Sequence, residues 1–452
     1  MDVDIIAIGD CACVAFDSAL RGLKVVAIEE RDFVRGVSFN LGTSLDFFKK
    51  RDAVSLFNIL GEQKILSKLA PGIVKPVRLI VLQEGDKLEH VISRAEVALY
   101  SVLTGNRAKV INPDKVFNIE PVIDAGSFKQ AILLGDVFAT DLRLNILLLR
   151  RAERLGAVCI NHADVELIEE DGKVTGVIVG EKEIKGKVIL SATEINRLGK
   201  RTRFKSTFKL VKILNIVLRN RIGLTNAVKF QDITAIPWDD LILVKMASRS
   251  KNLRREVKRA LDELNRILTV ELGEEDTLST FTYLQPLIDR DYIVLEEKEV
   301  ITFGFEPSAY RLAAKSVVDR VSDKECFTHV IPLKDAPISK KGIRRYLEEK
   351  YCLADIKIME KMIAEKPGLG SRIVENSPCI WAEVKFAVKY EFAKTLTDVM
   401  VGRLGLFFIG EHHAAEDVAN YMKKLLGWSE DRVERELKDY EALCRQFSQA
   451  IC

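Results

Sequence analysis

The sequence has 452 residues, of which 48% are hydrophobic, so it can form one large domain or two to three ordinary domains with a sizeable core. Its 69 Lys and Arg residues nearly balance its 66 Asp and Glu residues, which argues against nucleic acid as the main partner. The 8 cysteines lack C-x-x-C spacing and indicate reduced thiols rather than disulfides or zinc ligands.

The first thirty residues predict a strand, a turn, a helix and a second strand. Residues 3–8 form a buried apolar run, residues 12–21 have helical character and end at Gly22, and residues 24–29 are rich in Val, Ala and Ile. A βαβ unit of this kind implies parallel strands. The sequence therefore predicts the opening of a dinucleotide-binding domain.

The turn within IAIGDCACVAF departs from the pattern that such a domain needs. In G-x-G-x-x-G turns the glycines permit the tight turn, the approach of phosphate to the backbone and close helix packing. These positions fall on Gly9, Cys11 and Val14, and Asp10 adds a negative charge beside them. Glu29, in contrast, ends the second strand where an acidic residue accepts hydrogen bonds from a ribose. The sequence predicts the scaffold without an intact phosphate-binding turn.

The rest of the chain alternates between β-rich and helical segments. Residues 74–92 predict extended structure, residues 142–155 a helix and residues 157–190 a β-meander. A late strand returning to a helix indicates a split nucleotide domain with a second domain inserted into it. The later predicted elements are strands over 205–247, an amphipathic helix over 251–268, a strand in EVITFGFE, a helix over 310–321 and a mostly helical region over 338–449.

Several segments occur in the order and spacing of one known family. These are DIIAIGDCACVAFDSALRGLKVVAIEERDF, ILSKLAPGIVKPVRLIVL, ATDLRLNILLLRRAERLGAVCINHADV, AIPWDDLIL, TFTYLQPL, GFEPSAYRLAAKSVVDRV and LGWSEDRVERELKDYEAL. They resemble the corresponding segments of FAD-dependent glycerol-3-phosphate dehydrogenases, in which a GGGATGAG-like turn precedes a helix ending in ALRG. The resemblance covers nearly the whole chain, but no single motif is intact.

The resemblance implies an α/β fold with an FAD/NAD(P)-binding Rossmann-like domain, an inserted β-rich substrate domain and a C-terminal α-helical domain. FAD is the implied cofactor, and the carried-over contact residues are Gly9, Glu29, Ser38, Gly304 and Arg311. The implied boundaries are 1–74, 136–204 and 299–330 for the FAD-binding-like domain, 75–135 and 205–298 for the substrate-type domain, and 331–452 for the helical cap.

The departures from the family pattern fall on the cofactor and substrate sites. The His-Gly-Gly of the loop that contacts flavin and substrate is missing after Ser38, and Glu194 replaces the glycine of a later turn. Gln285 replaces an Arg that binds the substrate phosphate, and Glu306 replaces a Lys. A Gly-Thr-Thr-Asp stretch is replaced by residues 244–247, and an Arg-Arg-x-Arg run is reduced to Arg403. Gln cannot reproduce a bidentate Arg contact, so no catalytic residue is predicted.

Three functional hypotheses remain open. The first is a catalytically impaired glycerol-3-phosphate dehydrogenase-like protein, a pseudoenzyme that is a structural or regulatory partner of an active paralogue. The alternative is an active flavoprotein that oxidises glycerol 3-phosphate to dihydroxyacetone phosphate and passes electrons to a quinone or a carrier. The third is a protein that binds another ligand in the altered pocket. A paralogue or an electron-transfer subunit is the expected partner, and nucleic acid is not.

Location and metal binding are also predicted from the residues. The start of the chain lacks a basic segment, and no apolar run approaches the roughly 20 residues that span a bilayer, so we expect a cytoplasmic protein. Peripheral attachment at the inner face of the membrane is an option, and FFKKR over 47–51 is either a membrane- or partner-binding tip or a helix with a basic end. His412 and His413, like Cys11 and Cys13, have simpler explanations than metal binding, and no metal site is predicted.

Overall fold

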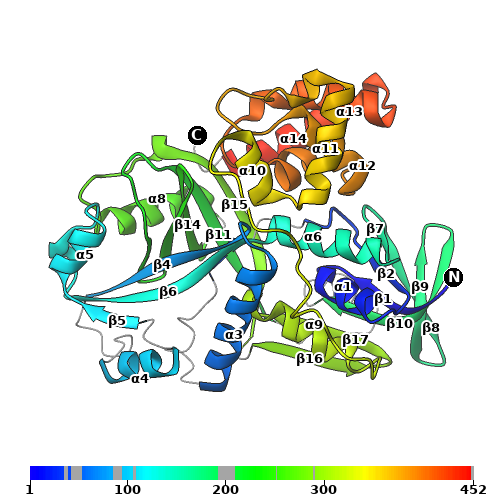
Figure 1. The fold of residues 1–452 in the computed structure, drawn as a ribbon, viewed down its shortest axis with the longest axis horizontal. Coiled ribbons are helices and arrows are strands. Elements are labelled where there is room, and N and C mark those ends of the chain that lie inside the picture. Colours follow the sequence, from blue (N-terminus) through cyan, green and yellow to red (C-terminus); the bar gives the residue numbers. More distant parts are fainter. Residues whose placement is uncertain are drawn as a thin grey trace.

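The computed structural model shows two β-sheets side by side and a C-terminal helical domain that contacts both (Figure 1). This arrangement confirms the expected α/β class with a helical C-terminal domain. None of the described helices is long and apolar enough to cross a membrane. The structure describes residues 1–34, 39–41, 53–84, 94–104, 108–191, 209–250, 252–288 and 291–448.

The first sheet is built on the predicted βαβ unit. Strand β1 (Asp2–Ile8) lies parallel to β2 (Val25–Ile28) and β10 (Lys182–Ser191), and β10 lies parallel to β17 (Val300–Phe305). The last four residues of β1 are fully buried, because both faces of this sheet are covered. The strand order is β16-β17-β10-β1-β2-β7, and β9 joins β8 to β10. The other strands are β7 (Val158–Ile160), β8 (Val165–Glu170), β9 (Lys173–Val179) and β16 (Tyr292–Glu297).

Three helices cover one face of the first sheet. Helix α1 (Ala12–Leu20) contacts α6 (Asp141–Arg154) and α9 (Tyr310–Val318). Apolar side chains of all three helices join those of β1 in one hydrophobic cluster. Because β1, β2, β10 and β17 are parallel, their carboxyl ends lie at one edge of the sheet, where nucleotides bind in folds of this type.

The second sheet has the strand order β15-β11-β14-β13-β12-β4-β6-β3, and β5 also pairs with β6. Its outer face packs against α8 (Leu253–Asn265), the predicted amphipathic helix, and its inner face packs against the C-terminal helical domain. The strands are β3 (Phe39–Leu41), β4 (Val74–Gln83), β5 (Ala108–Ile111), β6 (Gln130–Thr140), β11 (Lys209–Arg219), β12 (Ala227–Phe230), β13 (Ile233–Trp238), β14 (Leu241–Ala247) and β15 (Thr277–Leu287).

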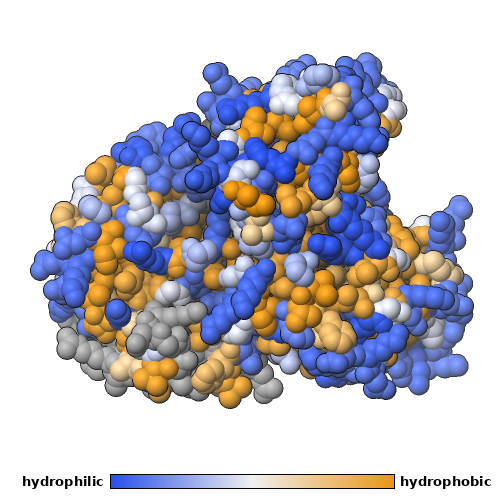
Figure 2. Space-filling view, viewed as in Figure 1, coloured by the Kyte–Doolittle hydropathy of each residue, from blue (hydrophilic) through white to orange (hydrophobic). Residues whose placement is uncertain are grey.

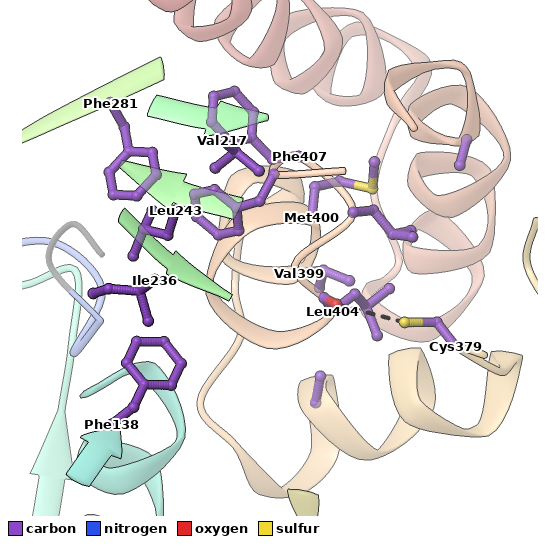
Figure 3. Packing of buried hydrophobic residues seen from close by; sticks show 14 of the residues in the cluster. Phe138, Val217, Ile236, Leu243, Phe281, Cys379, Val399, Met400, Leu404 and Phe407 are labelled. Atoms are coloured by element: carbon purple, nitrogen blue, oxygen red, sulfur yellow. Dashed lines mark hydrogen bonds between the residues drawn. The ribbon is translucent and has the colours of Figure 1, made fainter. Parts of the chain in front are cut away.

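The C-terminal helical domain, here called the cap, packs on the inner face of the second sheet. Figure 3 shows Val217 and Leu243 on neighbouring strands beside Phe407 of the cap. The rings of Phe281 and Phe408 make an edge-on contact with centroids 5.0 Å apart. The cap helices are α10 (Gly342–Lys350), α11 (Leu353–Glu365), α12 (Trp381–Tyr390), α13 (Ala415–Leu426) and α14 (Glu430–Ser448), with a π-helical turn over Asp398–Arg403. The remaining helices are α3 (Ala53–Leu69), α4 (Arg94–Thr104) and α5 (Pro113–Ile119).

The predicted elements are confirmed, with differences at their ends. The helix predicted over 310–321 ends at Val318, and the extended segment predicted over 74–92 is a strand as far as Gln83. Residues 85–93, 205–208, 251 and 449, which belong to predicted elements, lie outside the described part of the chain. Local apolar patterns therefore located the elements but did not fix where each one ends.

Candidate functional site

The turn between β1 and α1 donates its backbone N–H groups to the protein itself. The Gly9 N–H donates to the carbonyl of Ile28 at 3.0 Å, and the Cys11 N–H donates to the carbonyl of Gly9 at 2.7 Å. Between them, the Asp10 N–H donates to Ser191 Oγ at 3.2 Å. Such consecutive N–H groups bind phosphate oxygens in dinucleotide-binding turns. Here the Gly9 N–H continues the pairing of β1 with β2, and the N–H groups of Asp10 and Cys11 have acceptors within the protein.

Cys11 occupies the position of the second glycine in the motif. Its side chain is buried, and its Sγ lies 3.1 Å from the carbonyl oxygen of Ile8. Burial raises the pKa of the Cys11 thiol, and the nearby charges of Asp10 and Glu29 act in the same direction. The side chain is therefore a neutral thiol that fills the space on the inner side of the turn.

The first glycine position of the motif keeps its glycine, whereas the third does not. Gly9 has a φ of 88°, a backbone conformation that glycine adopts without strain, so the tight turn is preserved. Val14, at the third position, is fully buried in the hydrophobic cluster between α1 and the sheet. The β-branched side chain is therefore part of the core, and the helix packs on the sheet without the glycine.

Asp10 places a carboxylate beside the N-terminus of α1. Asn145 Nδ2 in α6 donates to Asp10 Oδ1 at 3.3 Å, which helps to hold the carboxylate in place. A helix N-terminus favours a negative charge, and in dinucleotide-binding folds the pyrophosphate supplies it. In this chain the carboxylate of Asp10 supplies that charge.

The residues of this turn do not fit the pyrophosphate of FAD, the cofactor that the resemblance implies. The N–H groups of Asp10 and Cys11 have acceptors, a side chain stands at residue 11, and the carboxylate of Asp10 would repel the phosphates.

Glu29 lies where the sequence predicts it, at the end of β2. Its side chain is buried, and its Oε1 accepts the backbone N–H of Arg31 at 3.0 Å. Its carbonyl accepts the N–H of Ala163 at 3.1 Å, which ties β2 to the segment after β7. The ribose-contacting position of the motif thus keeps its acidic residue while the phosphate-contacting positions have changed.

A second part of the candidate site lies where β15 approaches the end of β17. Gln285 Nε2 donates to Glu306 Oε2 at 3.3 Å, and the hydroxyl of Tyr283 lies 3.5 Å from Gln285 Oε1. Gln285 and Glu306 replace an Arg and a Lys in the resembled family, and here they contact each other. The altered site thus contains a carboxylate where the family has a cation, which disfavours an anionic substrate at this point.

The other predicted cofactor residues lie in different settings. Gly304 is buried near the end of β17, at the same edge of the sheet as Gly9 and Glu29. Arg311 in α9 instead forms a buried ion pair with Glu62 of α3, with Nε 2.8 Å from Oε2. Ser38, like Glu194 and the stretch 47–51, lies outside the described residues. The structure brings three of the predicted positions to one edge, and a role in binding remains a prediction for each.

A buried ion cluster next to Glu29 joins the cap to the first sheet. Arg403 donates to both carboxylate oxygens of Asp32, at 2.6 and 2.7 Å, and His162 Nε2 lies 2.9 Å from Asp398 Oδ2. The hydrogen bond to Asp398 raises the pKa of His162, although burial opposes this rise. The side chains of Asn161 and Lys394 also connect the two domains across this contact. The cluster therefore holds the cap in contact with the domain that contains the first sheet.

The same cluster contains the one group of three potential metal ligands among the described residues, Asp32, His162 and Asp398. The guanidinium of Arg403 already binds both oxygens of Asp32 and supplies the positive charge there. We therefore assign an ion cluster rather than a metal site. Within the described part of the chain, His412 and His413 belong to no such group.

Sequence reasoning missed Ser191 and Asp32 as site residues. Ser191 ends the predicted strand VILS, and Asp32 follows the second strand in EERDF. Ser191 ends a parallel strand and Asp32 follows one. This position at the carboxyl end of a strand was the signal in the sequence that could have identified them as site residues. Their partners, however, are distant in the sequence and could not be inferred from spacing.

Comparison with known proteins gives two family matches. Residues 12–306 match the family described as FAD dependent oxidoreductase, and residues 343–433 match the C-terminal domain of alpha-glycerophosphate oxidase. The chain is 24% identical over 501 residues to a glycerol-3-phosphate dehydrogenase of Mycobacterium leprae, covering 95% of this chain and 85% of that protein. It is 24% identical over 519 residues to a probable mitochondrial glycerol-3-phosphate dehydrogenase of Caenorhabditis elegans, covering 95% and 71%.

Solved structures show the same fold. The glycerol-3-phosphate dehydrogenase from Bacillus halodurans complexed with FAD superimposes with a TM-score of 0.80 at 20% identity, covering 99% of this chain and 95% of that one. The L-alpha-glycerophosphate oxidase from Mycoplasma pneumoniae with FAD bound gives a TM-score of 0.56 at 12% identity, covering 78% and 99%. The full-length match includes the cap, in agreement with the two family matches.

Proposed function

Because the chain belongs to the FAD dependent oxidoreductases and is related over 95% of its length to their glycerol-3-phosphate dehydrogenases, we propose that it is a catalytically impaired member of this group. In this proposal it serves as a structural or regulatory partner of an active, flavin-bearing paralogue. The chain shares its fold with these enzymes, but its site residues differ from theirs.

The turn after β1 is the observation that carries the proposal. The N–H groups of Asp10 and Cys11 donate to acceptors in the protein, and Asp10 brings a negative charge to the N-terminus of α1. A pyrophosphate would have to displace these contacts and approach a carboxylate. The chain's own groups therefore satisfy the contacts that a bound dinucleotide would otherwise make.

The substrate side supports the same proposal. Glu306 contacts Gln285, and neither side chain offers a positive charge to the phosphate of glycerol 3-phosphate. Arg311, a cation carried over from the family, is committed to Glu62. The sheets and the cap bury continuous hydrophobic clusters, so the altered site lies in a well-packed scaffold.

The alternative function, active oxidation of glycerol 3-phosphate, is favoured by the conformation of Gly9 and by the buried Glu29 at the ribose-contacting position. The two functions predict different behaviour of the purified chain. An active dehydrogenase reduces an artificial electron acceptor with glycerol 3-phosphate when FAD is present. An impaired partner does not.

Co-expression with a flavin-bearing glycerol-3-phosphate dehydrogenase from the same organism tests the partner role. We expect the two chains to elute together in a fixed ratio from a size-exclusion column, and the activity of the dehydrogenase to change when this chain is omitted. An unrelated flavoprotein of similar size is the control. Separate elution together with unchanged activity would contradict the proposal.

A further inference from the structure

Three side chains of the cap form a cluster that is separate from the candidate site. His412 lies in a short helical turn (His412–Ala414), and Tyr440 and Cys444 lie in α14, which belongs to the cap (Figure 1). His412 Nδ1 is 3.0 Å from the hydroxyl oxygen of Tyr440 and 3.5 Å from Cys444 Sγ. The cluster thus brings a nucleophilic sulfur, a potential base and a hydroxyl group into contact.

Helix geometry and ring packing hold the three groups together. Tyr440 and Cys444 are four residues apart in α14, so their side chains lie on the same face of the helix. The ring of His412 makes an edge-on contact with Phe407, with centroids 5.4 Å apart. Because Phe407 and Tyr440 are buried in the hydrophobic cluster of the cap, this packing fixes the imidazole beside the thiol.

His412 is suited to accept a proton near neutral pH. Burial lowers the pKa of its imidazole, Glu411 acts in the opposite direction, and His413 lowers it further. A neutral imidazole with its proton on Nε2 can accept a proton from the thiol at Nδ1. His412 therefore has the protonation state and the position of a general base.

Cys444 is a half-buried thiol whose reactivity depends on such a base. Burial raises the pKa of the thiol, a hydrogen bond from the Tyr440 hydroxyl opposes this rise, and the charge of Glu441 supports it. Little thiolate therefore forms unaided, and a neighbouring general base is one of the means by which proteins activate a thiol. Among the cysteines in the described part of the chain, Cys444 alone contacts a histidine.

We propose that Cys444 is a thiol-modification site, at which His412 is the general base and small disulfides are the reactants. The S–H proton of Cys444 passes to His412 Nδ1, the Tyr440 hydroxyl donates to the resulting thiolate, and Sγ attacks one sulfur of the disulfide. The S–S bond of the reactant breaks and a mixed disulfide forms at Cys444. The other half leaves as a thiolate and takes the proton from His412.

The step is balanced without a further oxidant. Cys444 is oxidised and the small disulfide is reduced to one thiol and one sulfur bound to the protein. The site lies on other residues than the turn after β1, so it goes beyond the partner role proposed above and does not depend on it.

Reaction of the full chain with hydroxyethyl disulfide, an uncharged small disulfide, tests the site. The reaction is quenched with acid at a series of times, and the modified peptides are quantified by mass spectrometry to give a rate for each cysteine. Cys159 is the internal control, because it is also half-buried, burial raises its pKa to about 12, and no described histidine contacts it. We expect Cys444 to react at least about ten-fold faster than Cys159 at neutral pH.

Two adjacent histidines provide a matched pair of variants. His412→Gln removes the base and should slow the reaction of Cys444 by about ten-fold or more. His413→Gln removes an exposed imidazole that pairs with Glu411, and it should change the rate by less than about two-fold.

The pH dependence of the wild-type rate separates a base-activated thiol from a merely accessible one and needs no variant. With His412 as the base, the rate rises as the imidazole loses its proton below about pH 6.5 and then changes by less than about two-fold between pH 7 and pH 8. An unassisted thiol instead becomes about ten-fold more reactive over that unit of pH.

The proposal is overturned if Cys444 reacts no faster than Cys159, if the two histidine variants react alike, or if the rate rises about ten-fold between pH 7 and pH 8. These outcomes leave the proposed partner role intact, because that role is tested by flavin content and co-elution.

Discussion

The hydroxyl of Ser191 accepts a hydrogen bond from the backbone N–H of Asp10 at 3.2 Å. This contact joins the end of β10 to the turn after β1, at the edge of the sheet where a dinucleotide would bind. The N–H groups of Gly9 and Cys11 on either side also donate to protein carbonyls. The turn is therefore closed by contacts within the chain.

Val14→Gly, which restores the third glycine of the motif, should destabilise the chain. Val14 is fully buried, so the substitution removes apolar contacts, leaves a cavity and adds glycine to a helix, at a cost of about 2–4 kcal/mol. Urea unfolding measures the change. Val102→Gly, at an exposed position in α4, is the control and should cost only the difference in helix propensity between Val and Gly, about 0.5 kcal/mol. Equal effects of the two substitutions would contradict the packing described for α1.

Cys11 and Cys13 should resist alkylation in the folded chain. Both thiols are buried, and burial raises the pKa of each, so little reactive thiolate forms. Among the described cysteines, iodoacetamide labelling followed by mass spectrometry should modify the partly exposed Cys159 and Cys444 before Cys11 and Cys13. Labelling of Cys11 as fast as Cys444 would show that the turn is open to solvent, contrary to the structure.

Arg403→Met should destabilise the docking of the cap. It leaves the carboxylate of Asp32 buried without its partner, which costs about 3–5 kcal/mol. The double substitution Asp32→Leu with Arg403→Met should recover much of this loss, because no unpaired charge remains. Lys438→Met breaks an exposed pair with Glu434 and should cost less than about 1 kcal/mol. A double variant as unstable as Arg403→Met alone would rule out the ion pair as the cause.

The contact between His162 and Asp398 should make stability depend on pH. The hydrogen bond to Asp398 raises the pKa of His162 in the folded chain, so its contribution is fully present below the unfolded pKa of about 6.5. It is lost as the pH rises through the folded pKa. The unfolding free energies of the wild type and His162→Gln should therefore differ more at pH 6 than at pH 9. A difference that grows with pH would have the wrong sign for this contact.

The sequence predicts most of the scaffold because its signals are local. The apolar run of β1, the spacing of leucines in α8 and the helical pattern of the cap each lie within one element. The changed glycine positions, Cys11 and Val14, are also visible in the sequence. The hydrogen bonds of the turn cannot be predicted from these two residues, because the acceptor Ser191 comes from the neighbouring strand β10.

The contacts that complete the site join residues far apart in the chain. Asp32 and Arg403 meet only when the cap docks, and Arg311 finds Glu62 on a helix of another segment. Spacing within the sequence carries no information about such pairings, so the ion pair of Arg311 with Glu62 could not be predicted, and a cofactor contact of Arg311 stays a prediction.

The visible absorption spectrum of the purified full chain, followed by titration with FAD, tests the central claim most directly. The closed turn predicts a colourless protein and no saturable change in the flavin spectrum or fluorescence as FAD is added. A stoichiometric flavin spectrum, or saturable FAD binding by the wild-type chain, would contradict the claim and favour an active dehydrogenase.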